Sequence, residues 1–161
     1  MNATVLKAIS LDSKRLSEIA WQSKSHWNYP KEWMELWRKG LTITPEIITQ
    51  NDVYKLVLTN GEIVGCTVLI TEEEVLWIEH LWILPTYIGH GFGKQLLQTA
   101  LKNTLQSIHQ KIKVVSDINA EIFYQKMGFE TVSQYESVPK GRFLPVMQYK
   151  NTLISLLLEK K

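Results

Sequence analysis

Three glycines at every second position separate an apolar run from an amphipathic segment in this chain. The apolar run covers Trp77–Leu84, the glycines are Gly89, Gly91 and Gly93, and the amphipathic segment covers Lys94–Leu105. This order predicts a strand, a glycine turn and a helix. Glycines allow a ligand to approach the backbone closely, and a helix N-terminus offers unpaired N–H groups and a positive dipole end. The turn is therefore predicted to bind an anionic group such as a pyrophosphate.

Two familiar glycine-rich phosphate sites do not fit this turn. A nicotinamide dinucleotide site reads G-x-G-x-x-G, with an acidic residue about twenty positions later. This chain has G-x-G-x-G, and residues 107–111 contain no acid. A phosphate loop needs Ser or Thr after its Gly-Lys pair, whereas Gln95 follows Lys94. A turn with glycines for packing alone is the remaining structural alternative, and three glycines in five residues exceed what it needs. The residues expected to surround the phosphate are Ile88, Gly89, His90, Gly91, Phe92, Gly93 and Lys94.

The same stretch resembles the signature of the GCN5-related N-acetyltransferases, the GNAT superfamily. That signature is Arg/Gln-x-x-Gly-x-Gly/Ala, and it follows an apolar strand that ends in a Val-x-Pro-like element. Ile83-Leu84-Pro85 matches this element, and Gly91 and Gly93 match the two signature glycines. Ile88 stands where Arg or Gln is usual. This replacement removes a side-chain contact to phosphate and leaves the backbone amides of the turn.

A second motif supports the resemblance. Residues 119–129 read Asn-Ala-Glu-Ile-Phe-Tyr-Gln-Lys-Met-Gly-Phe. They are similar to the family segment N-x-x-A-x-x-F-Y-x-x-x-G-F, with a tighter spacing between Asn and Ala. The two motifs occur in the family's order, within a similarity from about residue 50 to about residue 150. The resemblance implies an α/β fold of the α+β type, with a central mixed, mostly antiparallel sheet flanked by helices. It also implies acetyl-CoA as cosubstrate.

The resemblance assigns roles to individual residues. The pantetheine arm of CoA is expected along Leu81–Leu84, where a backbone N–H near Trp82 or Ile83 polarises the thioester carbonyl. Asn119, at the motif's asparagine, is expected to contact CoA. Tyr124 stands at the motif's tyrosine and is expected to protonate the departing thiolate, because a phenol with a pKa of ~10 is protonated at neutral pH. The alternative for Tyr124 is aromatic packing, a role that Phe123 fills better.

Two adjacent residues on the strand before the glycine turn are candidates for the base that deprotonates the amine. Adjacent strand residues face opposite sides, so only one of Glu79 and His80 points into a cleft unless a bulge intervenes. Many GNAT proteins place a Glu on this strand, which makes Glu79 the first candidate and His80, also a candidate substrate contact, the second. Removal of the proton by solvent alone stays open. The histidines show no metal-ligand pattern, and no metal is expected.

The acceptor site is expected where the chain is least like the family. GNAT proteins usually cover the acceptor with their first two helices and the loop between the last strands. In this chain Trp27 and Tyr29 are candidates for an aromatic pocket, whereas Trp33 and Trp37 at helical spacing favour core packing. In the loop over residues 138–143, Lys140 or Arg142 is a candidate to hold an acceptor carboxylate, the alternative being a solvated loop.

Composition limits the broader classes. The 161 residues, 45% apolar and 21% charged, predict one compact domain over residues 1–161. The net charge of +2 is too balanced to indicate nucleic acid or an anionic membrane as partner. The single cysteine, Cys66, is expected in the core. No signal peptide or apolar stretch of membrane-spanning length is evident, so a cytoplasmic location is expected.

Periodicity and turn residues predict the element order. Asn60-Gly61 is a hairpin signal, and Thr44-Pro45-Glu46 is a helix start. A C-terminal helix over Thr152–Lys161 is expected to pack on the sheet or to meet a second subunit. The remaining expected strands are Thr4–Ile9, Val53–Thr59, Ile63–Ile70, Lys111–Ser116, Phe129–Ser137 and Pro145–Tyr149, and the remaining expected helices are Leu11–Ser23, Pro30–Gly40 and Ala120–Lys126.

These observations lead to one expected function and one alternative. The expected function is transfer of the acetyl group of acetyl-CoA directly to a primary amine of a small molecule or an amino-acid-like acceptor. The alternative is a module that binds acyl-CoA as a sensor and catalyses nothing. Tyr124 favours the enzyme, and Ile88 favours the sensor. The sequence does not identify the acceptor amine.

Overall fold

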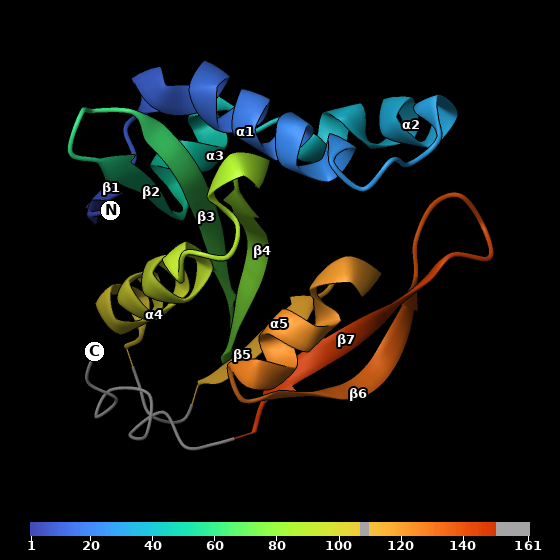
Figure 1. The fold of residues 1–161 in the computed structure, drawn as a ribbon. Helices are drawn as coiled ribbons and strands as arrows, with labels where there is room; N and C mark the ends of the chain where they lie inside the picture. Colours follow the sequence, from blue (N-terminus) through green and yellow to red (C-terminus); the bar gives the residue numbers. More distant parts are fainter. Residues whose placement is uncertain (107–109, 151–161) are drawn as a thin grey trace.

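Seven strands form one mixed sheet through the middle of the molecule (Figure 1). The computed structural model describes residues 1–106 and 110–150. The strand order is β1-β2-β3-β4-β5-β7-β6, with β4 and β5 parallel and every other pair antiparallel. The predicted α/β class, a mixed and mostly antiparallel sheet flanked by helices, is confirmed. The strands are β1 (Ala3–Lys7), β2 (Asp52–Leu58), β3 (Ile63–Glu72), β4 (Val75–Ile83), β5 (Lys111–Val115), β6 (Phe129–Glu136) and β7 (Phe143–Tyr149), and the α-helices are α1 (Ser13–Ser25), α2 (Lys31–Leu41), α3 (Pro45–Gln50), α4 (Phe92–Thr104) and α5 (Glu121–Lys126).

Local sequence signals explain several of these boundaries. Gly61 adopts φ +91° in the turn between β2 and β3, a conformation that favours glycine. The Thr44 side chain accepts a hydrogen bond from the Ile47 amide and caps α3. Helix α4 begins at Phe92, two residues before the predicted start, because Gly91 rather than Gly93 is its N-cap. Strand β7 begins two residues before Pro145, whose carbonyl accepts a hydrogen bond from the Ser116 amide.

Helices cover both faces of the sheet at β3. All six residues from Val64 to Leu69 are buried, which requires cover on both faces because strand side chains alternate. Helix α1 packs on β3 and β4, and α4 packs across β1 to β4. The core includes Leu16 and Ile19 of α1, Leu56 of β2, Leu69 of β3, Leu76 of β4, Leu96, Leu97 and Leu101 of α4 and Ile112 of β5.

The two parallel strands separate after a short stretch of pairing. Val75–Ile78 of β4 pair with Lys111–Val114 of β5, whereas β4 continues to Ile83 in register with β3 alone. On its other side, β5 pairs with β7. The sheet therefore opens between β4 and β5, and the gap-side backbone groups of Glu79–Ile83 have no strand partner among the described residues.

Two further expectations concern the C-terminal segment and membrane-spanning helices. The predicted C-terminal helix, residues 152–161, lies outside the described residues. Within residues 1–106 and 110–150, none of the helices combines the length and apolar character that a membrane crossing requires.

Candidate active site

The gap between β4 and β5 leads into a cavity of about 510 Å³. Its wall is formed by β4, the glycine turn, the end of β5, α5 and the C-terminal part of α1. Four candidate residues from the sequence, Tyr29, His90, Lys140 and Arg142, are not part of the wall. The predicted residues that do line it are Trp27, Glu79, His80, Trp82, Ile83, Ile88, Gly89, Gly91, Phe92, Gly93, Lys94, Asn119 and Tyr124.

The glycine turn presents the N-terminus of α4 to this cavity. Gly89 and Gly91 adopt φ +92° and +78°, so the turn needs glycine for its conformation. Gly91 is the N-cap, and no side chain caps the helix. A Cβ on Gly93 would lie 3.1 Å from the Phe123 ring, so this glycine allows α4 to pack closely on α5. The helix end thus keeps its first N–H groups available to an anion.

A bulge in β4 brings two adjacent side chains to the cavity. Val68 pairs with His80 and Leu69 pairs with Ile78, so Glu79 between them has no counterpart in β3. Both Glu79 and His80 line the cavity. The sequence analysis allowed for a bulge as an exception to strand alternation, and the structure contains this bulge.

His80 is held as a neutral, hydrogen-bonded ring. Its Nδ1 accepts a hydrogen bond of 2.9 Å from Trp82 Nε1. Burial lowers the pKa of His80 to about 4, so the imidazole is uncharged at neutral pH. Because Nδ1 is an acceptor, the proton of the neutral ring lies on Nε2. The ring can donate a hydrogen bond, and its one lone pair is already engaged.

Glu79 and Tyr124 have the protonation preferences of a base and an acid. Partial burial raises the pKa of Glu79, and the charge of Glu72 raises it further, although the side chain retains solvent exposure. Burial also raises the pKa of Tyr124. The Tyr124 ring packs against Phe123 and Phe129 with centroids 5.1 and 5.5 Å apart. Its phenol therefore stays protonated in the pH range in which Glu79 is ionised.

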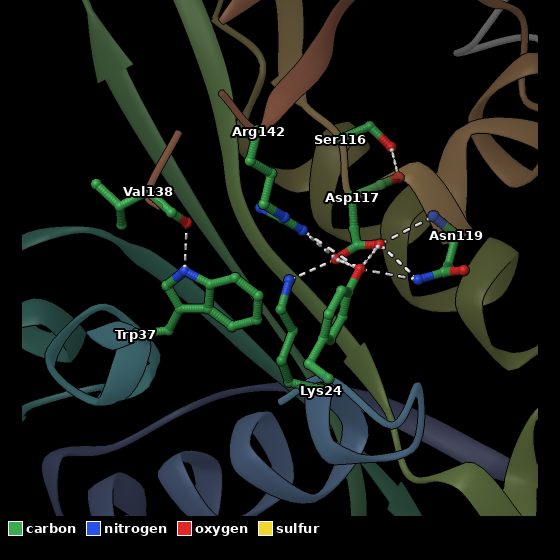
Figure 2. Close-up of polar contacts among 8 residues, drawn as sticks. Lys24, Trp37, Ser116, Asp117, Asn119, Val138 and Arg142 are labelled. Carbon is green, nitrogen blue, oxygen red and sulfur yellow. Dashed lines mark hydrogen bonds and ion pairs between the residues drawn. The ribbon is translucent and has the colours of Figure 1, made fainter. Parts of the chain in front are cut away.

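A polar cluster with little solvent exposure borders the cavity (Figure 2). It consists of Lys24, Tyr29, Trp37, Asp117 and Arg142, and we call it the Asp117 cluster. Lys24 Nζ forms an ion pair with Asp117 Oδ2, and Arg142 Nη2 lies 3.4 Å from the same oxygen. The Tyr29 hydroxyl donates to the Asp117 carboxylate at 3.0 Å. Trp37 donates from Nε1 to the Val138 carbonyl at 2.8 Å. The cluster joins α1 and α2 to the end of β5 and to the loop before β7.

Asn119 connects this cluster to the cavity wall. Its backbone amide and side-chain Nδ2 both donate to Asp117 Oδ1 at 2.9 Å, and Nδ2 also donates to the Tyr29 hydroxyl at 3.0 Å. Asp117 and Asn119 line the cavity themselves. Tyr29 and Arg142, two predicted substrate residues outside the wall, are therefore linked to it through Asp117.

Burial and charge act against each other inside the cluster. Burial alone would raise the pKa of Asp117, but the charge of Lys24 and the hydrogen bonds from Lys24, Asn119 and Tyr29 outweigh it and lower that pKa. Burial lowers the pKa of Lys24, and Asp117 offsets this only in part, since the charge of Arg142 lowers it further. Burial and the charge of Asp117 raise the pKa of Tyr29. Asp117 is therefore ionised at neutral pH.

Lys24 and Asp117 were not among the residues predicted from the sequence. Lys24 lies on the buried face of α1, four residues after Ala20, and a lysine at such a position is itself a signal. Asp117 follows the end of a parallel strand, the edge at which open α/β sheets bind ligands. Both signals were present in the sequence.

A family model and several solved structures are similar to this chain. Residues 50–131 match the family model of the acetyltransferase (GNAT) domain. PaiA N-acetyltransferase from Thermoplasma acidophilum, solved in complex with coenzyme A, superposes with a TM-score of 0.71 at 18% identity, covering 94% of this chain and 100% of that one. The ribosomal-protein-S18-alanine N-acetyltransferase from Escherichia coli gives a TM-score of 0.66 at 14% identity, over 91% and 92% of the two chains.

One curated protein is similar in sequence over part of its length. A glutamate–cysteine ligase from Dictyostelium discoideum is 30% identical over an alignment of 117 residues, and the match covers 62% of this chain. The chain spans 18% of the length of that ligase. The family assignment therefore rests on the domain match, which covers half of the chain and both glycine-turn and β4 residues of the cavity. This chain belongs to the GNAT acetyltransferase family.

Proposed function

We propose that this chain transfers the acetyl group of acetyl-CoA directly to a primary amine of a small molecule or an amino-acid-like acceptor. The observation that carries the proposal is the single cavity that brings together the glycine turn, the gap-side edge of β4 and Tyr124. Bound acetyl-CoA would supply the thioester, the activated acyl group of the reaction. Membership of the GNAT family agrees with this chemistry.

The residues of the cavity fit coenzyme A. The uncapped N-terminus of α4 would hold the pyrophosphate, and no atom outside the turn lies within 4 Å of a Cβ placed on Gly91. The gap-side backbone groups of Glu79–Ile83 would pair with the pantetheine amides. Ile88, half exposed in the wall, replaces the Arg or Gln usual in the family. Backbone amides would therefore carry most of the phosphate binding.

The side chains divide the proton transfers between them. Acetyl transfer forms one N–C bond, breaks one C–S bond, removes a proton from the amine and delivers a proton to sulfur. A backbone N–H at Trp82 or Ile83 would polarise the thioester carbonyl, and Tyr124 would protonate the sulfur. Glu79 is our candidate for the base, because its raised pKa lies nearer to neutrality. His80 is less suited, because its lone pair accepts from Trp82.

Release of free CoA thiol tests the proposal directly. Protein and acetyl-CoA are incubated with a panel of primary amines, and a thiol-reactive dye follows the reaction. The protein's one cysteine, Cys66, is buried with its pKa raised to about 12 by burial, so the folded protein contributes little signal. We expect amine-dependent thiol release that falls in a Tyr124→Phe variant.

Calorimetry with CoA separates the enzyme from a binding module. CoA binding without thiol release from any amine would favour the sensor function, for which the half-exposed Ile88 is the supporting observation. Absence of both binding and release would contradict the proposal. A Glu79→Gln variant that retains full activity would leave deprotonation of the amine to solvent.

A further inference from the structure

The Asp117 cluster contains one more buried positive charge than negative charge. The side chains of Lys24, Asp117 and Arg142 are 11%, 15% and 10% exposed. Each of the two cations has Asp117 as its ion-pair partner among the described residues. Burying an unpaired charge is costly, so such a surplus indicates a missing anion.

The single negative charge of Asp117 cannot neutralise the positive charges of both Lys24 and Arg142. Its Oδ1 accepts from Tyr29 and twice from Asn119, and its Oδ2 accepts from Lys24, Tyr29 and Arg142. The contact with Arg142 is long, at 3.4 Å, which is beyond the usual range for a charge-assisted hydrogen bond. The aromatic ring of Trp37 holds Lys24 Nζ and Arg142 Cζ, each 4.6 Å from its centre. These contacts stabilise the cations without cancelling their charge.

Arg142 keeps the donors that a second anion would need. Both hydrogen bonds of its side chain use Nη2, so Nη1 and Nε have no hydrogen-bond partner within residues 1–106 and 110–150. In the same ranges, every side-chain nitrogen or oxygen that is sealed from solvent has a partner. The unused donors are therefore reachable from outside. Nε and Nη1 lie on opposite sides of the guanidinium, so each can donate a hydrogen bond to a carboxylate oxygen.

We propose that Arg142, supported by Lys24, binds a carboxylate of the acceptor, so that the acceptor class is an amine that carries a carboxylate. This inference rests on the proposed function and names its substrate class. Asp117 and Asn119 join the cluster to the cavity wall, so an acceptor could reach the cavity with its amine while its carboxylate contacts Arg142. Figure 2 shows Arg142 and Lys24 directed toward the same carboxylate oxygen of Asp117.

Matched pairs of acids and amides test this inference in two ways. The first measurement is thiol release from acetyl-CoA with each of the twenty amino acids and with its carboxamide, which keeps the amine and removes the charge. The second is calorimetry of the N-acetylated amino acids and their carboxamides with CoA present, which needs no turnover. We expect at least one acid to exceed its carboxamide by roughly 10- to 100-fold in kcat/KM and in affinity, as expected for hydrogen bonds to a charged group.

Two arginine variants locate the effect. Arg142→Gln should reduce the preference for acid over carboxamide to a few-fold, and Arg142→Lys, which keeps the charge but not the planar guanidinium, should restore it in part. Arg38→Gln is the matched control, because Arg38 also packs on a tryptophan, with its Cζ 4.2 Å from the Trp21 ring, and pairs with one carboxylate, that of Glu35. It lies outside the cavity wall and should leave the preference unchanged.

The outcomes separate this inference from the proposed function. Equal binding of every acid and its carboxamide would overturn the inference, as would a preference that survives Arg142→Gln or that is lost in Lys140→Gln instead. Charge-dependent binding without thiol release would support the carboxylate site and contradict the acetyltransferase proposal. Equal thiol release with acids and carboxamides would support the acetyltransferase proposal and contradict the carboxylate site.

Discussion

His80 lies in the cavity wall with its Nδ1 atom bonded to Trp82, and burial lowers its pKa to about 4. Because the unfolded chain binds this proton near pH 6.5, the unfolded state holds more protons between pH 6.5 and 4, and stability falls as the pH drops through that window. A shift of this size corresponds to a loss of about 2 kcal/mol between pH 7 and pH 5. Urea unfolding at the two pH values measures it.

A His80→Gln variant provides the control for this titration. The glutamine amide oxygen can still accept from Trp82 Nε1, but the side chain does not titrate. The variant should therefore lose about 2 kcal/mol less stability than the wild type between pH 7 and pH 5. An identical pH dependence in both proteins would mean that another group is responsible.

Tyr124 offers the second test at the residue scale. Tyr124→Phe keeps the ring contacts with Phe123 and Phe129, so folding and CoA affinity should stay close to wild type. Turnover should slow by roughly 10²–10⁴-fold, as expected for loss of a positioned proton donor. The defect should shrink as the pH rises toward the ordinary pKa of a thiol, ~8.5, because the thiolate then departs without a proton. A pH profile with one active amine measures both effects.

Two outcomes of the Tyr124→Phe experiment would contradict the role of the hydroxyl group as proton donor. A variant as fast as wild type at neutral pH would remove the phenol from the mechanism. A loss of CoA affinity equal to the loss of rate would indicate a binding role for the hydroxyl group instead.

At the scale of elements, the glycine turn before α4 should respond differently from the glycine turn of the β2–β3 hairpin. Gly91 and Gly61 adopt φ +78° and +91°, and a Cβ on either would meet no atom within 4 Å. Alanine at either position should cost a similar stability, about 1 kcal/mol, because of backbone strain. Only Gly91→Ala should weaken CoA binding, since Gly91 is the N-cap of α4 at the cavity.

Thermal melts and CoA calorimetry on both alanine variants decide this point. Equal loss of affinity in Gly91→Ala and Gly61→Ala would show that affinity follows general stability. Undiminished affinity in Gly91→Ala would place the pyrophosphate away from the turn.

The elements that the sequence predicted well are those with local signals. Asn60-Gly61 predicted the hairpin, Thr44 predicted the cap of α3, and the glycines predicted a turn before a helix. The bulge at Glu79 had no such signal, because it is set by the pairing of β4 with β3 and not by the residues of β4 alone. Its effect on the cavity is that Glu79 and His80 both reach the wall.

At the scale of the whole molecule, the Asp117 cluster joins segments that are far apart in the sequence. Lys24 and Asp117 are separated by 93 positions, and Tyr29 and Arg142 by 113. Periodicity and short motifs describe neighbours along the chain, so they do not show that these four residues meet; the family resemblance alone placed Tyr29 and Arg142 in one expected substrate region. The family resemblance predicted the fold, and only the folded structure shows the contacts of these residues with Asp117.

Asp117 should make a pH-dependent contribution to the stability of the entire domain. Asp117→Asn leaves Lys24 and Arg142 without an anion, which should cost about 3 kcal/mol at pH 7. Because the pKa of Asp117 is lowered in the folded protein, its contribution is complete above the ordinary value of 3.8 and is lost as the pH falls through the lowered value. The difference between wild type and variant should therefore shrink in strong acid.

Urea titrations of both proteins at pH 7 and pH 3 measure this contribution. Asp52→Asn is the control, because Asp52 pairs with Lys7 at the surface, where the two side chains are 41% and 57% exposed. It should change stability by less than about 1 kcal/mol. A similar loss in both variants would show that Asp117 acts as an ordinary surface charge.

The buried thiol of Cys66 allows local opening of the sheet to be measured without an introduced cysteine. Cys66 lies in β3, directly opposite Trp82 of β4, and is fully buried. A thiol reagent can modify it only when this part of the sheet opens, so the labelling rate reports the free energy of that opening. A ligand that binds along the edge of β4 should slow the labelling in proportion to its occupancy. The same chain would thereby provide a binding assay for any CoA derivative or amine, whether or not it is a substrate.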